Sequence, residues 1–517
     1  MKKILSLVIA CCLMAGCTAA PAESTAPMAS EEQTSETGSS QFLPEGDVVQ
    51  ISLDNQNVTI SGDGSGVFLS RDIIYYETKT EYFSGNPYGE GEPWQMHTAE
   101  EAGSHLVVNI TKPGNYRLSG KLDKGQIRVD LGEAAYEDSA AVVNLILDGV
   151  DITCTVGPAI LFRNVYECDG NWSVGSAKPD VDTTAAGANL ILAQDSANIV
   201  NGSHVAKIYK DKPGQKKLWK QDGAIYSYMS MNVYGPGSLV LNADNEGLDT
   251  ELHLTIWGGD IVIRSGNDGI NTNEDGVSVT TVLGGNLYIL AGLGEEGDGI
   301  DSNGYLVIRG GRVISSAHPA SDAGLDSDLG SFIHGGTVVA LGSAMDWAES
   351  DSDQVTMNLQ FDKMQTGEIR ITREDGTAVF SFDPAKDDIL GKQLRGYQGM
   401  ILSCPEFLVG DGYEVFADGV QMAYTGTDVM RHPGGMPPAE GGQRPEGGGF
   451  PGGPGGKNPP EDMPEPPQPP EGAMPSMPEG GMPQGGPGGF AGEAGMKNSL
   501  FFMQDKVNFF SGLTSAE

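Results

Sequence analysis

A short acidic phrase occurs four times in the middle of this 517-residue chain. Each copy contains glycine, an aliphatic residue, Asp or Asn, and then Thr or Ser: G-L-D-T, G-I-N-T, G-I-D-S and G-L-D-S. The third position carries, in chain order, Asp249, Asn271, Asp301 and Asp326. Carboxylate and amide oxygens are the ligands that hard cations such as Ca²⁺ prefer, and no His or Cys in the phrase favours a transition metal. The phrase therefore indicates cation binding.

The surrounding repeat indicates the strands that would position these oxygens. A second phrase follows each copy, for example G-G-D-I-V-I, and the last turn glycines of these phrases, from Gly237 to Gly336, are 22, 26, 26 and 25 residues apart. Apolar residues alternate with a period of two inside each repeat, which is typical of strands rather than helices. We therefore predict an all-β fold, a right-handed parallel β-helix with three short strands per coil of 22–26 residues.

The alternation also predicts which side chains face the core. The aliphatic residue of each acidic phrase should face inward, so the Asp or Asn after it should face outward. Stacked strands lie about 4.8 Å apart, and like charges at that separation repel unless cations neutralise them. We therefore predict bound Ca²⁺. The candidate ligands, which include neighbouring turn residues, are Asp244, Asp249, Asp268, Asn271, Asp298, Asp301, Asp322, Asp326 and Asp328.

The sequence leaves the grouping of these ligands open. Glu246 stands in the same turns as a further oxygen donor, whereas the first copy of the repeat, G-A-I-Y-S, has Tyr226 in the column and is expected to bind no ion. Asp and Asn also favour turns for reasons unconnected with metal binding, so a solvated acidic face is the alternative interpretation.

A column of apolar side chains is expected on the outside of the same coils. Its members are Val240, Val262, Tyr288, Ile314 and Val339. Such a column must be covered or must bind something. We expect the region after the repeat, or the apolar segment Leu500–Phe510, to cover it.

The charge of the chain excludes several classes of protein. Lys and Arg number 31 against 70 Asp and Glu, which gives a net charge of −39. A chain this acidic is a poor nucleic-acid ligand, because that affinity depends on basic residues neutralising phosphates. The one basic cluster, Lys207–Lys220, is interpreted as a solvated loop, and no nucleophile, metalloprotease or P-loop motif occurs.

The N-terminus predicts export. A basic start and a short apolar run end in L-M-A-G-C, which resembles the lipobox of bacterial lipoproteins. We expect residues 1–16 to be a signal peptide, Cys17 to carry lipid, and residues 17–48 to form a flexible tether. The predicted location is the outer face of the bacterial membrane; an ordinary secretory signal cut near Ala20 is the alternative.

The remaining chain divides by composition. We expect the β-helix over residues 49–345, a small β domain or cap over 346–425, a disordered segment over 426–498 and a C-terminal segment over 499–517 that docks on the body. Between Pro433 and Met496 there are 20 Gly and 17 Pro, which cannot bury enough apolar surface to fold. Cys154, Cys168 and Cys404 match no zinc motif; a 154–168 disulfide is open, with ordinary buried thiols favoured.

The repeat resembles a known family. D-G-I-D-S (Asp298–Ser302), preceded by G-N-Y-R-L-S-G (Gly114–Gly120) and G-P-A-I (Gly157–Ile160), looks like the calcium-binding, carbohydrate-binding β-helix proteins known from clostridial surface lipoproteins, over roughly Leu106–Gly342. That family is similar in fold to pectate-type polysaccharide lyases and binds polygalacturonate and other plant polysaccharides. The resemblance implies a calcium role for the acidic column, with Asn271 standing where the family has Asp.

Two functions follow from the resemblance, and the calcium-stiffened coil on its lipid tether gives a third. The first is a monomeric surface module in which calcium joins an acidic polysaccharide to the protein's own carboxylates. The second is a calcium-dependent lyase, which needs a base beside the column, where the repeats offer only Arg264, Arg309 and Arg312 on other strands. The third is a non-catalytic structural adhesin. We favour the binding module, with the membrane reached only through the N-terminal lipid.

Overall fold

The computed structural model describes residues 44, 46–55, 57–77, 81–82, 86–87, 91–209, 217–343, 346–384, 386, 395–427 and 497–517. The expected signal peptide, Cys17, nearly all of the tether and the Gly/Pro-rich segment lie outside these residues. Within the described part of the chain, no helix has the length and apolar character needed to cross a membrane.

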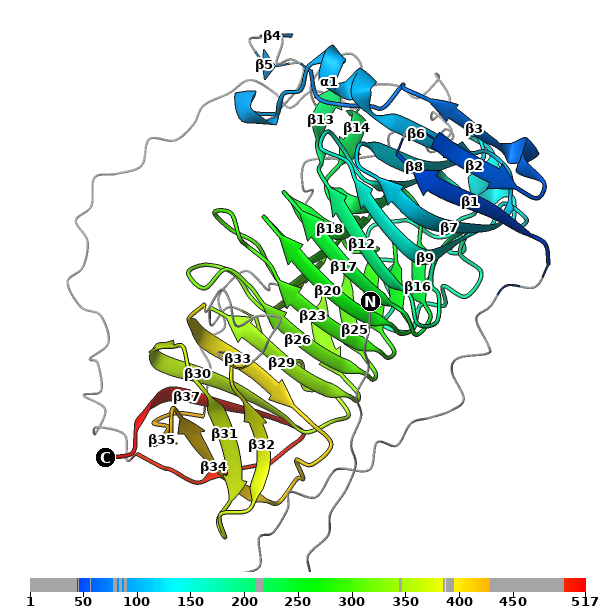
Figure 1. Ribbon diagram of the computed structural model, residues 1–517. Helices are drawn as coiled ribbons and strands as arrows, with labels where there is room; N and C mark the ends of the chain where they lie inside the picture. Colours follow the sequence, from blue (N-terminus) through cyan, green and yellow to red (C-terminus); the bar gives the residue numbers. More distant parts are fainter. Residues whose placement is uncertain are drawn as a thin grey trace, which may run out of the picture. The chain divides into compact units, whose positions relative to one another are not determined.

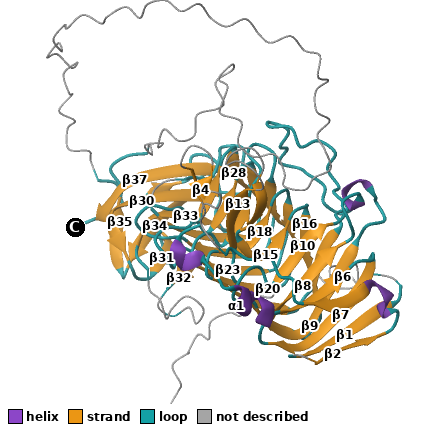
Figure 2. Ribbon diagram, turned by 90° about the horizontal axis from the view of Figure 1, so that it is seen from above, coloured by secondary structure: helices purple, strands orange, loops and turns teal. Residues whose placement is uncertain are grey.

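The fold is all-β, as predicted (Figure 2). The described helices are α1 (Ala99–Ser104) and three single 3₁₀ turns, η1 (Gly64–Gly66), η2 (Pro93–Gln95) and η3 (Ala135–Glu137). Two small hairpins stand outside the main sheets: β4 (Glu81–Tyr82) with β5 (Asn86–Pro87), and β13 (Val205–Tyr209) with β14 (Lys217–Gln221).

Three parallel ladders link each repeat to the next, and Figure 1 shows the longest of them running from β9 through β29. This first ladder contains β1 (Val48–Asp54), β7 (Gly114–Leu122), β9 (Val143–Thr153), β12 (Ala197–Gly202), β17 (Ser238–Ala243), β20 (Asp260–Ser265), β23 (Asn286–Leu290), β26 (Arg312–Ser316) and β29 (Thr337–Gly342). The second leaves the same β7 and β9 and continues through β11 (Ala188–Leu192), β16 (Met231–Tyr234), β19 (Leu254–Ile256), β22 (Val279–Val282), β25 (Tyr305–Ile308) and β28 (Gly330–Ile333).

The third ladder carries the acidic phrases. It contains β6 (Leu106–Ile110), β8 (Gly125–Asp130), β10 (Ile160–Asn164), β15 (Gly223–Ser227), β18 (Glu246–Thr250), β21 (Ile270–Thr272), β24 (Ile300–Ser302) and β27 (Leu325–Ser327). At the N-terminal end β2 (Asn57–Ser61) and β3 (Val67–Ser70) pair antiparallel with β1 and β6.

The predicted inward positions form the core. Leu248, Ile270, Ile300 and Leu325, one above another on the third ladder, are all fully buried. On the first ladder the alternate residues of β17, β20, β23, β26 and β29 are buried in the same way. The period-two pattern of the sequence therefore identified the core side of both ladders correctly.

The glycine that opens each acidic phrase is required by close packing between repeats. A Cβ at Gly269 would lie 2.2 Å from Cγ2 of Ile289 and 2.5 Å from the carbonyl oxygen of Gly299. A Cβ at Gly247 would meet the carbonyl oxygen of Gly269 at 2.4 Å. No side chain fits there, which explains why glycine recurs although the backbone at these positions has no positive φ.

The region after the repeats covers part of the apolar column, as expected. It contains β30 (Thr356–Gln365), β31 (Ile369–Arg373), β32 (Ala378–Phe382), β33 (Tyr397–Ser403), β34 (Gly412–Ala417), β35 (Val420–Ala423), β36 (Phe501–Phe502) and β37 (Val507–Ser515). Ile314 and Val339 are fully buried in its core and Tyr288 packs against it, whereas Val240 and Val262 stay half-buried. The link is β33, which pairs antiparallel with β29 and β30, while β37 lies parallel to β30.

The three described cysteines are free thiols, so the 154–168 disulfide that the sequence left open is absent. Burial raises the pKa of both Cys154 and Cys404 to about 12. These thiols therefore stay protonated and unreactive at neutral pH.

Candidate cation-binding site

The acidic residues stand in register on the third ladder. Asp249 pairs with Asn271, Asn271 with Asp301, and Asp301 with Asp326. Parallel neighbours lie about 4.8 Å apart, so the side chains form one continuous column. Tyr226 occupies the next position beyond Asp249, and its hydroxyl donates to Glu251 instead of offering a free oxygen to the column.

The prediction that this column faces solvent is wrong at its first members. Asp249 is 0% exposed and Asn271 is 7% exposed, although Asp301 and Asp326 stay half-buried. The segment before β15 contributes to this enclosure through Lys220, so the interpretation of Lys207–Lys220 as a solvated loop does not hold for that residue; residues 210–216 lie outside the described residues. Its Lys220 ammonium lies 2.9 Å from Oδ2 of Asp222 and donates to Oδ1 of Asn273 at 2.6 Å, and Asn273 in turn donates to Asp249.

Three carboxylates lie close together near the Lys220 ammonium group. Asp222, Glu246 and Asp249 each place an oxygen within 4.8 Å of the other two. We call these three residues, together with Asn271, the upper acidic group. Oε1 of Glu246 accepts from the amide of Asn271 at 3.1 Å. Among the described residues, no N–H or hydroxyl group donates to Oε2 of Glu246, Oδ2 of Asp249 or Oδ1 of Asn271, all of which are buried, and the Glu246 and Asp249 carboxyls lie within hydrogen-bond reach of each other.

These unpartnered oxygens are costly unless something binds them. A buried acceptor without a donor loses its hydration with no compensation, about 1–3 kcal/mol each. All three belong to hard oxygen ligands, and they lie on neighbouring strands of one ladder. The donor set therefore fits a cation such as Ca²⁺, held by Asp222, Glu246, Asp249 and Asn271.

The carboxyl pKa values show the same electrostatic stress. Burial, reinforced by Glu246, raises the pKa of Asp249 well above its ordinary value, and burial together with Asp222 raises that of Glu246. Burial alone would lower the pKa of Lys220, but the surrounding carboxylates outweigh it and raise that pKa well above its ordinary value. One ammonium group thus does not neutralise the whole upper acidic group.

A second cluster, the lower acidic group, continues the column through Asp268, Asp298, Asp301 and Asp326. Burial raises the pKa of Asp298 to about 7 and that of Asp301 to about 8, in both cases reinforced by the nearby Asp326. Oδ1 of Asp268 accepts the Asp298 N–H at 2.7 Å, and Oδ1 of Asp298 accepts the Ala323 N–H at 2.6 Å. Backbone donors therefore fix two of these carboxylates in place.

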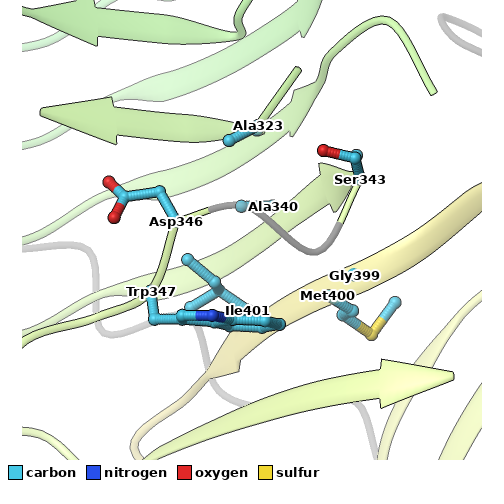
Figure 3. A pocket seen from close by; sticks show the side chains of 10 residues that line it. Ala323, Ala340, Ser343, Asp346, Trp347, Gly399, Met400 and Ile401 are labelled. Atoms are coloured by element: carbon cyan, nitrogen blue, oxygen red, sulfur yellow. The ribbon is translucent and has the colours of Figure 1, made fainter. Parts of the chain in front are cut away.

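The lower acidic group ends at a small cavity between the last repeat and β33 (Figure 3). Asp346 lines it beside Trp347, with its carboxylate directed away from Met400. Burial and the neighbouring Asp326 raise the pKa of Asp346 well above its ordinary value, and its Oδ2 is buried without a described partner. Asp346 thus extends the column into the region after the repeats.

Comparison with known proteins identifies the family. The sequence model of a family described as "carbohydrate-binding domain-containing protein" matches residues 104–377, more than half of the chain. The chain belongs to this family. A carbohydrate-binding domain-containing protein of Acetivibrio thermocellus is 31% identical over 163 residues, which are 31% of this chain and 46% of that protein, so the match spans about half of the relative's length.

One solved structure is a distant neighbour of this carbohydrate-binding domain. It is the polysaccharide lyase-like protein from C. thermocellum, as a gadolinium derivative. It is 23% identical, and the alignment covers 56% of this chain and 93% of that chain with a TM-score of 0.32. A likeness this distant indicates no function.

Three predicted ligands of the carbohydrate-binding domain are members of neither group, although the charges of Asp322 and Asp328 act on the lower one. Asp244 is exposed and accepts from Ser203 at 2.6 Å and lies 3.1 Å from Nδ1 of His204. Asp322 accepts the Gly297 N–H at 2.9 Å, so one of its oxygens supports the turn before Asp298. Asp328 is exposed, and its charge helps to raise the pKa of Asp301.

Three residues of the site were not predicted from the sequence. Asp222 stands just before Gly223 of the first repeat copy, and its carboxylate could have been recognised as a candidate ligand. That copy was excluded because Tyr226 stands where the later copies have Asp or Asn. Lys220 comes from an insert without periodicity, and Asp346 follows the last repeat. No spacing rule connects either one with the acidic column.

Proposed function

We propose that this carbohydrate-binding domain holds acidic polysaccharide through calcium bound in the acidic column. The observation that carries the proposal is the set of buried, unpartnered oxygens on Glu246, Asp249 and Asn271. Calcium bound there would neutralise the protein's buried carboxylates, so that the acidic column would no longer repel the carboxylates of a uronate polymer. Without such neutralisation, a chain of net charge −39 would repel that polymer.

The order in which the chain visits the three ladders supports a β-helix interpretation of the fold, which is part of this proposal. The chain visits the second, first and third ladders in turn, for example through β19, β20 and β21 and then β22, β23 and β24. We interpret this arrangement as the right-handed parallel β-helix expected from the repeat. A stacked coil of this kind would keep oxygen ligands of successive repeats at a fixed spacing along a linear polymer.

The location is part of the same proposal. Lipid on Cys17 would hold the domain at the outer face of the bacterial membrane, with the residues that follow as a tether. Radiolabelled palmitate should enter the full-length chain in a bacterial host and should not enter a Cys17→Ala variant. Equal labelling of both chains would contradict lipidation at Cys17.

The cation site is tested by removing its charges without changing its shape. Isothermal calorimetry with calcium should show binding to the unchanged protein, and a Glu246→Gln/Asp249→Asn double variant should bind at least tenfold more weakly, because two of its ligands become neutral. Asp260→Asn is the matched control, since Asp260 is an exposed acid of β20 outside both acidic groups. Equal calcium affinity in all three proteins would contradict the site.

Polysaccharide binding is tested separately. Retention of the mature protein on immobilised polygalacturonate should require calcium and should disappear with EGTA. The double variant should lose retention, and Asp260→Asn should keep it. Calcium-independent retention would contradict the calcium-mediated model, and absence of retention on polygalacturonate would exclude this ligand.

Lys220 supports one alternative, a calcium-dependent lyase. A lyase needs a base near the column to remove the proton next to a uronate carboxylate, and Lys220 supplies an amine where the repeats offered none. Its raised pKa keeps the amine protonated, which disfavours that role. Ultraviolet-absorbing unsaturated product from polygalacturonate, lost in Lys220→Met, would establish the lyase over the binding module.

A further inference from the structure

Trp94 presents a large apolar surface to solvent. Its side chain is 76% exposed, more than Phe68 at 51% or Phe502 at 44%. It lies in η2, whose ends are held by reciprocal hydrogen bonds between Glu92 and Gln95. The indole is therefore displayed by a turn with a fixed backbone.

The turn is anchored to the β13 segment. Gly91 packs so closely that an added Cβ would lie 2.5 Å from Cβ of Ala206 and 2.6 Å from the Tyr76 ring. The Tyr76 hydroxyl donates to the Gly91 carbonyl at 3.0 Å. Trp94 thus occupies a fixed place beside β13 without contributing its own side chain to the core.

Polar side chains border the indole. The Trp94 and His204 rings lie 6.5 Å apart at an angle of 59°. Because Oε1 of Gln95 accepts from Glu92, its amide nitrogen faces Nε2 of His204 at 2.6 Å. Nδ1 of His204 then faces the exposed carboxylate of Asp244 at 3.1 Å.

This cluster adjoins the upper acidic group. β13 and β14 pair Val205 with Gln221, so His204 and Asp222 lie next to each other at the base of the same hairpin. Paired strands are about 5 Å apart. The carboxylates of Asp222 and Glu246 are close enough to act on the pKa of His204, which is raised because Asp244, Asp222 and Glu246 outweigh the effect of its burial.

We propose that Trp94 is a stacking platform for a sugar ring of the same polysaccharide, with Asp244 accepting from its hydroxyl groups. The C–H face of a pyranose ring carries partial positive charge and is attracted to the negative face of an indole. An exposed apolar ring bordered by an acceptor suits a sugar, which presents both kinds of surface. The inference rests on the proposed function and adds a second contact point to the cation site.

The test separates sugar contact from folding and from metal binding. Trp94→Ala should weaken the binding of polygalacturonate oligosaccharides in calcium by roughly three- to tenfold, whereas Trp94→Phe should keep most of the affinity. Calcium affinity and melting temperature should not change in either variant. Phe502→Ala is the matched control, because it removes an exposed aromatic ring from β36 in the region after the repeats.

The other possible results of this experiment would each contradict either the stacking platform or the proposed function. Equal oligosaccharide affinity of Trp94→Ala and the unchanged protein would overturn the platform and leave the proposed function standing. A lower melting temperature or weaker calcium binding in Trp94→Ala would show a structural role instead. Failure of the unchanged protein to bind the oligosaccharides would overturn both proposals.

Discussion

Glu246 and Asp249 hold two carboxyl groups side by side, away from water, with an oxygen of each unpartnered. Burying like charges so close together opposes folding, and protonation or a bound cation relieves the repulsion. In the metal-free protein protons supply that relief, because burial raises the pKa of both carboxyls above their ordinary values. A divalent cation would relieve both residues at once, whereas relief by protons makes the stability of the metal-free protein depend on pH.

Stability of the metal-free protein should fall as pH rises. The pKa of Asp298 is about 7 and that of Asp301 about 8 in the folded protein, whereas both carboxyls ordinarily titrate near 3.8. Between about pH 4 and 8 the folded state therefore binds more protons than the unfolded state, so its free energy of unfolding declines with increasing pH. Urea unfolding in EGTA at half-unit steps from pH 5 to 8 measures the decline.

Comparison with two variants and with calcium tests whether the acidic column causes the decline of the free energy of unfolding with pH. Asp301→Asn should flatten it, while Asp260→Asn, outside the acidic groups, should leave it unchanged. Calcium should also flatten it by occupying the carboxylates. A metal-free protein whose stability rises across this range would contradict the raised pKa values.

The register of the acidic residues could be predicted, but their burial could not. Asp249, Asn271, Asp301 and Asp326 repeat with the strands, so the period alone places them one above another. Asp249 is enclosed in part by Asn273, which donates to it, and Asn273 in turn accepts from Lys220, which comes from an insert that shares no period with the repeat. Contacts between segments that are far apart in the sequence leave no local pattern from which burial could be predicted.

At the scale of elements, the repeat depends on close approach of successive strands. The acidic phrase begins with glycine because the carbonyl of the next repeat occupies the space of a Cβ. This requirement was visible in the sequence as a recurring glycine, although its reason is steric contact rather than the turn conformation that glycine often indicates. The pairing of β33 with β29 was not predictable in this way, because β33 lies outside the repeat.

Gly269→Ala should destabilise the protein by about 2 kcal/mol or more. The new methyl group would overlap Ile289 and the backbone of Gly299, and the backbone cannot move aside without disturbing the ladder. Gly103→Ala is the control, since its Cβ would meet nothing within 4 Å and alanine favours the helix α1. Urea unfolding of the two variants gives the comparison; equal midpoints would contradict the packing argument.

At the scale of the whole molecule, the acidic composition and the fold are connected through the column. Several of the acidic residues behind the formal net charge of −39 stand in two stacked carboxyl groups rather than on a diffuse solvated surface. Asp346 extends the lower group into the region that β33 joins to the repeats. Cation binding is therefore expected to tie together the last repeats and the region that follows them.

Calcium should raise the thermal stability of the whole described body, because a ligand that binds only the folded state stabilises it by mass action. At a free concentration 100 times the dissociation constant, the gain is about 2.7 kcal/mol per site. Differential scanning calorimetry should show a higher melting temperature with calcium than with sodium chloride of the same ionic strength, which screens charges without occupying the ligands. If sodium chloride gives the same increase in melting temperature, charge screening explains the effect and the acidic column needs no specific ion. If calcium alone gives the increase, and the Glu246→Gln/Asp249→Asn variant reduces it, the stabilisation originates in the buried oxygens.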